Sequence, residues 1–362
     1  MYAQGYFDYD SRKSGGLTVS HLRFGDKPIK SRYPIDRPDF VACHNQSYVY
    51  KYHVIRGLKK NGKFILNTIW TPEELDERLP ASIKRYIAQN HIEFYIINAV
   101  KIAQDVGLGG RINMIMQAAF FKIANIIPVE DAIKFLKEAV VKSYGNKGEK
   151  IVNMNHAAID AGLEGITKIK VPYSWNTDLD DKLELDENFP EFIKEITRPM
   201  NRLEGDSMPV SHFVKAGIQD GTFMSGTTSY EKRGIAVNVP EWIPENCIQC
   251  TQCSYICPHA TIRAFLLNED EKEKAPESLK VLDSKGIKGD EKLYFSIGVT
   301  PLDCTGCGNC AQVCPAPGKA LVIKSQDSQH EQIEAWNYYM ERVKPKNPLN
   351  KYTLKAVSYT HL

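Results

Sequence analysis

Eight of the nine cysteines lie between Cys247 and Cys314, in two runs with the same spacing. The runs read Cys247-x2-Cys250-x2-Cys253-x3-Cys257-Pro258 and Cys304-x2-Cys307-x2-Cys310-x3-Cys314-Pro315. This is the bacterial pattern for binding two [4Fe–4S] clusters, in which the fourth cysteine of each run binds the other cluster. The pattern predicts one cluster on Cys247, Cys250, Cys253 and Cys314, and a second on Cys304, Cys307, Cys310 and Cys257.

The spacing has a physical reason. Three cysteines at intervals of three let one short loop reach three corners of an iron–sulfur cube, and the fourth is carried away toward the second cube. Small and apolar neighbours, such as Gly306, Gly308 and Ile248, would allow close approach and exclude water. Zinc is the main rival, but structural zinc takes four ligands, usually as two separated pairs, and two triplets do not suit that arrangement.

Composition excludes several classes of protein. The chain has 362 residues, enough for two or three domains, with 43% hydrophobic and 25% charged residues. A net charge of +2 indicates no nucleic-acid or membrane-surface partner. There is no apolar run of membrane-spanning length and no signal peptide, so the cytoplasm is the expected compartment, and clustered cysteines there indicate metal binding.

The first 175 residues predict an α/β domain. Short apolar runs at 40–44, 64–69 and 94–98 are typical of buried strands, and helical patterns lie between and after them. Residues 111–127 place an apolar stripe on one face of a helix, and Pro128 follows. Strands that alternate with helices favour an α/β layer architecture.

The rest of the chain divides by composition. Residues 176–240 begin with an acidic, weakly periodic linker and continue into a small domain rich in Gly, Pro, Ser and Thr. Residues 241–325 hold the cysteine runs, and the charged stretch 269–277 between them is expected to be a solvated insertion. Residues 326–362 form a connector, in which 333–339 are expected to be helical.

Three weaker signals have two interpretations each. Cys43 beside His44 could be a nucleophile, although a buried thiol is the commoner finding. Residues 107–110, Gly-Leu-Gly-Gly, could hold a phosphate at a helix start, but a turn between two helices is the simpler interpretation. Residues 231–233, Glu-Lys-Arg, are expected to be a charged surface turn.

Several motifs together resemble the pyruvate:ferredoxin (flavodoxin) oxidoreductase family. Residues 227–236 are similar to its small EKR domain, and residues 242–250 lead into the two-cluster domain in the expected order. Upstream, residues 2–7, 14–23 and 107–128 are similar to its gamma-type domain. The resemblance implies a three-layer gamma-type α/β domain at 1–175, lacking its first strand and glycine loop. A linker with the EKR domain at 176–240 and a ferredoxin-like α+β domain with two [4Fe–4S] clusters at 241–325 would follow.

The resemblance also implies a reaction. Family members convert pyruvate and coenzyme A to acetyl-CoA and carbon dioxide, and pass two electrons singly to ferredoxin or flavodoxin. Thiamine diphosphate, magnesium and a third cluster are expected only in segments that this chain does not contain, and a full-length homodimer is expected. No catalytic residue is expected within the chain itself.

The family's members are much longer than this chain, so a fragment, or else a subunit of a split enzyme, is expected, inactive with pyruvate when alone. Two other functions stay open. The chain could be a module of another 2-oxoacid:ferredoxin oxidoreductase, or a stand-alone iron–sulfur electron carrier whose α/β half only docks a partner.

Overall fold

The computed structural model describes residues 1–10, 16–178, 188–286 and 292–346. The chain divides into two compact units, Met1–Tyr230 (unit 1) and Glu231–Leu362 (unit 2). Much of the predicted acidic linker and of the C-terminal connector lies outside the described residues. The described residues contain no helix that is both long enough and apolar enough to cross a membrane.

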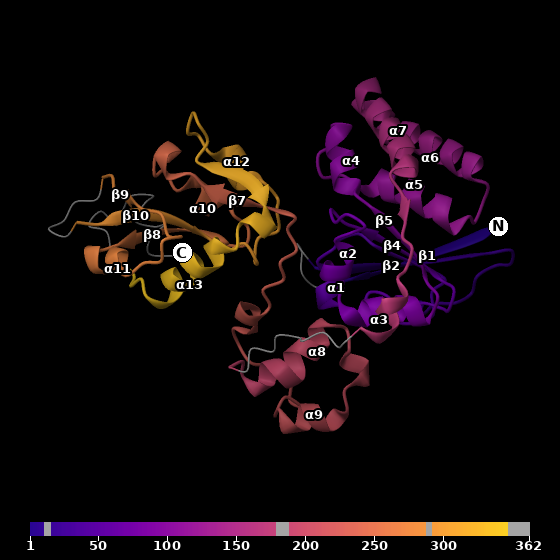
Figure 1. Ribbon diagram of the computed structural model, residues 1–362, viewed down its shortest axis with the longest axis horizontal. Coiled ribbons are helices and arrows are strands. Elements are labelled where there is room, and N and C mark those ends of the chain that lie inside the picture. The colour runs from indigo at the N-terminus through magenta and orange to yellow at the C-terminus, as the bar shows by residue number, and fades with distance from the viewer. Residues whose placement is uncertain (11–15, 179–187, 287–291, 347–362) are drawn as a thin grey trace. The chain divides into compact units, whose positions relative to one another are not determined.

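In unit 1 a sheet lies between two layers of helices, which makes a three-layer α/β structure, and α8 (Arg198–Asn201) and α9 (Val210–Lys215) lie apart from it (Figure 1). Its strands are β1 (Tyr2–Tyr9), β2 (Thr18–Gly25), β3 (Phe40–Cys43), β4 (Lys63–Asn67), β5 (Glu93–Ile97) and β6 (Thr167–Lys168). Its longer helices are α3 (Ala81–Gln89), α4 (Ala99–Asp105), α5 (Asn113–Ala124), α6 (Val129–Tyr144) and α7 (Glu149–Glu164). Its other short helices are α1 (Tyr48–Lys51) and α2 (Leu75–Arg78).

The central sheet has the order β3-β4-β5-β6, with the first three strands parallel and β6 antiparallel. Alternate side chains face opposite layers, because successive residues of a strand point to opposite sides. Phe64 and Phe94 stack at 5.3 Å in the core with α2 and α3, whereas Ile65 and Ile97 pack toward α4 and α5. The predicted strands at 40–44, 64–69 and 94–98 and the helix at 111–127 are therefore confirmed within one or a few residues.

Unit 1 also contains a glycine-rich turn and an antiparallel strand pair. The Gly-Leu-Gly-Gly stretch is a turn between α4 and α5, with Gly107 and Gly109 at positive φ. Strands β1 and β2 form an antiparallel hairpin that the periodicity did not reveal. Its aromatic side chains Tyr6, Phe7 and Tyr9 are about half exposed or more, so little burial signal exists in the sequence.

Unit 2 is built from antiparallel strands and short helices. Its strands are β7 (Asn238–Trp242), β8 (Ile262–Leu267), β9 (Leu282–Asp283), β10 (Tyr294–Val299) and β11 (Leu321–Ser325). Its helices are α10 (Gln252–Ile256), α11 (Glu269–Glu273), α12 (Asn309–Val313) and α13 (Glu331–Glu341). The expected helix at 333–339 is part of α13, which packs on β10.

The strands of unit 2 relate the two cysteine runs by an approximate twofold repeat. Strand β7 precedes the first run and pairs with β11, which follows the second. Strand β10 precedes the second run and pairs with β8, which follows the first. Each run therefore begins on one strand pair and ends on the other, which crosses the two runs.

The stretch 269–277 differs from its prediction. It contains α11, which a capping box between Asn268 and Glu271 begins. The Glu271 side chain is buried and ion-paired with Lys346 at 2.6 Å, so this insertion is folded onto unit 2 instead of being solvated throughout.

Candidate iron–sulfur site

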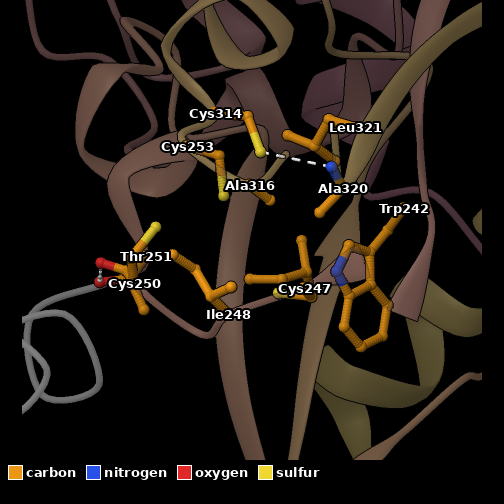
Figure 2. A pocket seen from close by; sticks show the side chains of 11 residues that line it. Trp242, Cys247, Ile248, Cys250, Thr251, Cys253, Cys314, Ala316, Ala320 and Leu321 are labelled. Carbon is orange, nitrogen blue, oxygen red and sulfur yellow. Dashed lines mark hydrogen bonds between the residues drawn. The ribbon is translucent and has the colours of Figure 1, made fainter. Parts of the chain in front are cut away.

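The first predicted set of cysteines lines one cavity of unit 2. Cys247, Cys250 and Cys253 come from the first run, and Cys314 reaches in from the second. Figure 2 shows them around the pocket, with Cys253 and Cys314 above, Cys250 to the left and Cys247 below. The remaining wall is mostly apolar and comes from Trp242, Ile248, Thr251, Ile297, Ala316, Ala320 and Leu321.

The second predicted set lines a second cavity. Cys304, Cys307 and Cys310 come from the second run, and Cys257 reaches in from the first. The structure thus brings together four cysteines per cavity in the combinations that the spacing predicts.

Both loops reach this arrangement through the same unusual backbone. The second and fourth residues after the first cysteine have positive φ in each loop. These are Gln249 (60°) and Thr251 (61°) in one loop, and Gly306 (72°) and Gly308 (76°) in the other. A non-glycine residue in this conformation costs about 1–2 kcal/mol, so the shape is imposed by the surroundings and not by local preference.

Gly306 is required for a second reason. A Cβ atom on Gly306 would lie 3.1 Å from the carbonyl oxygen of Asn238 and 3.2 Å from Cβ of Ala236, whereas one on Gly308 would meet nothing within 4 Å. Gln249 is held differently. Its buried side chain donates to the carbonyl of Asp283 and accepts from the N–H of Lys285, both at 2.8 Å.

Backbone N–H groups point at the sulfurs in both cavities. In the first, the N–H of Gln249 donates to Cys247 Sγ at 3.4 Å, and that of Ala320 donates to Cys314 Sγ at 3.3 Å. In the second, Gly306 donates to Cys304 at 3.4 Å and Thr261 to Cys257 at 3.3 Å. Such donors stabilise negative charge on sulfur, which a reduced cluster increases.

Without a cluster, the buried thiols hold their protons tightly. Burial, with the nearby thiols of Cys247 and Cys250, raises the pKa of Cys253 to about 12. Burial likewise raises the pKa of Cys310 to about 12, with a contribution from its neighbouring thiols. Because iron binds the thiolate, loading these sites must release protons.

Two buried donors beside the first cavity test whether a cluster fits. Trp242 Nε1 and Ser254 Oγ have no hydrogen-bond partner among the described residues. Trp242 lines the first cavity, where its nitrogen lies on the side of the ring facing the cysteines (Figure 2), and Ser254 follows Cys253. A buried donor without a partner costs about 1–3 kcal/mol, and a cluster would supply sulfur acceptors. The donors and thiols present therefore fit such a group.

Within the described ranges, no three or more His, Cys, Asp or Glu side chains are grouped as they would be around a metal ion. The four thiolates of a cubane bind four different iron atoms, so they stand further apart than the ligands of one ion.

Residues 231–233 contact the residues that precede the second cysteine run, which the sequence pattern did not indicate. Lys232 Nζ lies 2.6 Å from Oδ2 of Asp303, which also accepts from Thr300 Oγ1 and directly precedes Cys304. The N–H of Gly234 donates to the carbonyl of Leu302 at 2.8 Å. The segment expected to be a surface turn therefore packs against the residues that lead into the second cysteine loop. In the sequence, the acidic residue Asp303 directly before Cys304 was the feature that could have indicated this contact.

Cys43 lies in unit 1 at the end of β3 and is buried. Burial raises the pKa of its thiol to about 12, which leaves little nucleophilic thiolate at neutral pH. The interpretation of Cys43 as a buried core residue fits these properties. His259, which follows Cys257 and Pro258, lines the second cavity.

Comparison with known proteins adds three matching family models. A family described as pyruvate ferredoxin/flavodoxin oxidoreductase matches residues 1–165. The EKR family, described as a domain of unknown function, matches residues 179–236, and a 4Fe-4S dicluster domain matches residues 246–317.

Similar curated proteins are much longer than this chain. A pyruvate-flavodoxin oxidoreductase of Enterobacter agglomerans is 54% identical over 99% of the chain and 30% of its own length. A pyruvate:ferredoxin oxidoreductase of Moorella thermoacetica is 54% identical over 97% of the chain and 29% of its own length. A pyruvate dehydrogenase [NADP(+)] of Cryptosporidium parvum is 45% identical over 99% of the chain and 20% of its own length. The chain thus spans less than a third of these relatives.

Proposed function

We propose, from the premise that this chain belongs to the pyruvate ferredoxin/flavodoxin oxidoreductase family, that it is the electron-transfer section of such an enzyme. The observation that carries the proposal is the lining of the two cavities, because each receives three cysteines from one run and one from the other. When bound, two [4Fe–4S] clusters would accept and release single electrons there. The ligand sets proposed are those that the sequence predicts.

The chain's own residues would perform three tasks. The thiolates hold the clusters, and the backbone donors of Gln249, Ala320, Gly306 and Thr261 stabilise the added negative charge of the reduced state. Apolar walls such as Trp242 and Ile297 limit the access of water. The two runs cross within one small unit, which favours a short path for electrons between the sites.

The reaction of the whole enzyme is part of the proposal. Pyruvate and coenzyme A would give acetyl-CoA, carbon dioxide, a proton and two electrons. Thiamine diphosphate, magnesium and a third cluster would be bound by other parts of a longer, homodimeric protein. The acceptor proposed is ferredoxin or flavodoxin, because the two relatives with 54% identity carry those names. A reducing cytoplasm is the compartment proposed, since eight of the nine cysteines are proposed to bind clusters instead of forming disulfides.

Anaerobic purification followed by iron and sulfide analysis and electron paramagnetic resonance tests the proposal. About eight irons and eight sulfides per chain are expected from two cubane clusters, with interacting signals after reduction. Zinc, or no metal, in anaerobically prepared protein would overturn it.

A second assay measures reduction of a dye by pyruvate and coenzyme A, for which the chain alone should be inactive. Activity without added subunits would contradict the assignment of thiamine chemistry to other segments.

A further inference from the structure

The repeat of unit 2 identifies which residues of the two sites correspond. The N–H of Ile243, four residues before Cys247, donates to the carbonyl of Ala320 at 2.8 Å. The N–H of Thr300, four residues before Cys304, donates to the carbonyl of Thr261 at 2.9 Å. Ala320 and Thr261 also directly precede the equivalent strands β11 and β8. Thr261 is therefore the counterpart of Ala320.

These two residues make the same backbone contact with the fourth cysteine of their run. Ala320 N–H lies 3.3 Å from Cys314 Sγ, and Thr261 N–H lies 3.3 Å from Cys257 Sγ. Only Thr261 adds a side-chain contact, because its Oγ1 lies 3.2 Å from Cys257 Sγ. Ala320 has only a methyl group at this position.

We propose that the Thr261 hydroxyl donates a hydrogen bond to the Cys257 thiolate and raises the reduction potential of the cluster held by Cys304, Cys307, Cys310 and Cys257. This inference rests on the proposed function. An iron-bound thiolate carries no proton, so the hydroxyl must be the donor. Its bond stabilises the reduced cluster more than the oxidised one, because reduction adds negative charge to the sulfurs. Thr261 is only 2% exposed, and in such surroundings water does not replace a lost donor.

Thr261 is thus a positioning residue that acts on the second cluster through its ligand Cys257. Its hydroxyl favours the reduced state of that cluster. At the first site the available side-chain donor is the indole N–H of Trp242. The equivalent residue before the second run is Val299, whose side chain has no donor. The potentials of the two sites should therefore be separately adjustable.

The test uses anaerobically prepared full-length enzyme with Thr261→Val, which keeps the branched shape and removes the hydroxyl. Iron and sulfide content are measured first, and a redox titration followed by electron paramagnetic resonance then gives the potential of each cluster. Thr261→Val should retain its iron and lower one potential only. The expected change is about tenfold in the distribution of one electron between the clusters, or about 59 mV for a one-electron couple.

Three further variants make the result specific. Thr261→Ser restores a hydroxyl and should recover most of the original potential, whereas Thr261→Ala should lower the same potential as valine even if valine packs poorly. Ala320→Thr supplies the missing hydroxyl to Cys314 and should raise the potential of the other cluster.

Unchanged potentials in fully loaded Thr261→Val and Thr261→Ala would overturn the inference, as would equal shifts in the serine and valine variants. Either result leaves the proposed function intact, because the iron content would still equal that of the unmodified enzyme. An absence of clusters in the unmodified protein would instead defeat the proposed function.

Discussion

The two cysteine loops of unit 2 have the same backbone but stabilise it by different means. The second loop uses Gly306 and Gly308 where φ is positive, so the chain needs no side-chain support there. The first loop places Gln249 and Thr251 in the same conformation, and the Gln249 side chain is hydrogen-bonded to the backbone of Asp283 and Lys285. A duplicated site can therefore keep its geometry while one copy becomes dependent on a neighbouring segment.

The lead-in residues of the two loops differ in a similar way. Asn246 precedes the first run and donates to the carbonyls of Gly318 and Lys319, which lie just before β11. Asp303 precedes the second run and pairs with Lys232. The start of the first run is thus hydrogen-bonded to the residues that follow the second run. The start of the second run is instead ion-paired with the first residues of unit 2.

The largest effect is expected from replacing a cysteine that lines the cavity of the other run. Cys257→Ala should remove about four irons and abolish the same paramagnetic signal as Cys307→Ala, although Cys257 belongs to the first run. The reason is that Cys257 lines the cavity of the second run. Iron analysis and the resonance spectrum of each variant measure this.

Cys250→Ala provides the contrast, since it should remove the other signal, and Cys43→Ala in unit 1 should leave about eight irons per chain. If Cys257→Ala removed the same signal as Cys250→Ala, the runs would each hold their own cluster and the crossing would be wrong.

A second prediction concerns the glycines of the second loop. Gly306→Ala should lower the free energy of unfolding by about 2–4 kcal/mol, from strained φ and from contact with the Asn238 carbonyl. Gly308→Ala is the matched control. It has the same strain but open space around it, so about 1–2 kcal/mol is expected. Denaturant unfolding of the loaded protein compares them, and equal losses would show that the close approach is unimportant.

The support of the first loop can be removed with Gln249→Ala. The variant removes the two hydrogen bonds that the Gln249 side chain makes with the Asp283 carbonyl and the Lys285 N–H, which should cost about 1–3 kcal/mol. Hydrogen exchange should speed up at residues 282–285. Gln252→Ala changes an exposed glutamine of the same loop and should have no such effect. If exchange in the Gln249 variant stayed slow, residues 282–285 would be held by other contacts.

The smallest effect concerns the insertion itself. Burial alone would raise the pKa of Glu271, but hydrogen bonds from Lys346, from the N–H of Lys344 and from that of Asn268 outweigh it and hold the pKa below its ordinary value. A lowered folded pKa adds stability above the ordinary pKa of about 4.3, and this stability is lost as pH falls through the folded value.

Glu271→Gln should therefore cost about 1–2 kcal/mol at pH 7, and the difference from the unmodified protein should shrink below about pH 4. Thermal unfolding at several pH values measures the loss of stability at pH 7 and its decrease at low pH. Glu277→Gln alters an exposed carboxylate and should change neither the stability at pH 7 nor its dependence on pH. A difference that grew at low pH would reverse the sign assigned to this carboxylate.

The sequence predicted those features that depend on local spacing. The cysteine intervals indicated which four side chains meet, and the apolar runs located β3, β4 and β5. It did not predict the pairs that join distant segments. Glu271 looked like one charge among many, because its partner Lys346 lies 75 residues away, and Lys232 pairs with Asp303 across 71 residues. The counterparts Thr261 and Ala320 emerged only when the strand pairing aligned the repeats.

The exchange of fourth cysteines also has a consequence for synthesis on the ribosome. Under the proposed ligand sets, a nascent chain ending before Cys304 holds only three thiols for one cluster and one for the other. The second site is complete when Cys310 has emerged, and the first when Cys314 follows four residues later. Both sites therefore become competent almost together, and a product terminated before Cys310 can mature neither of them.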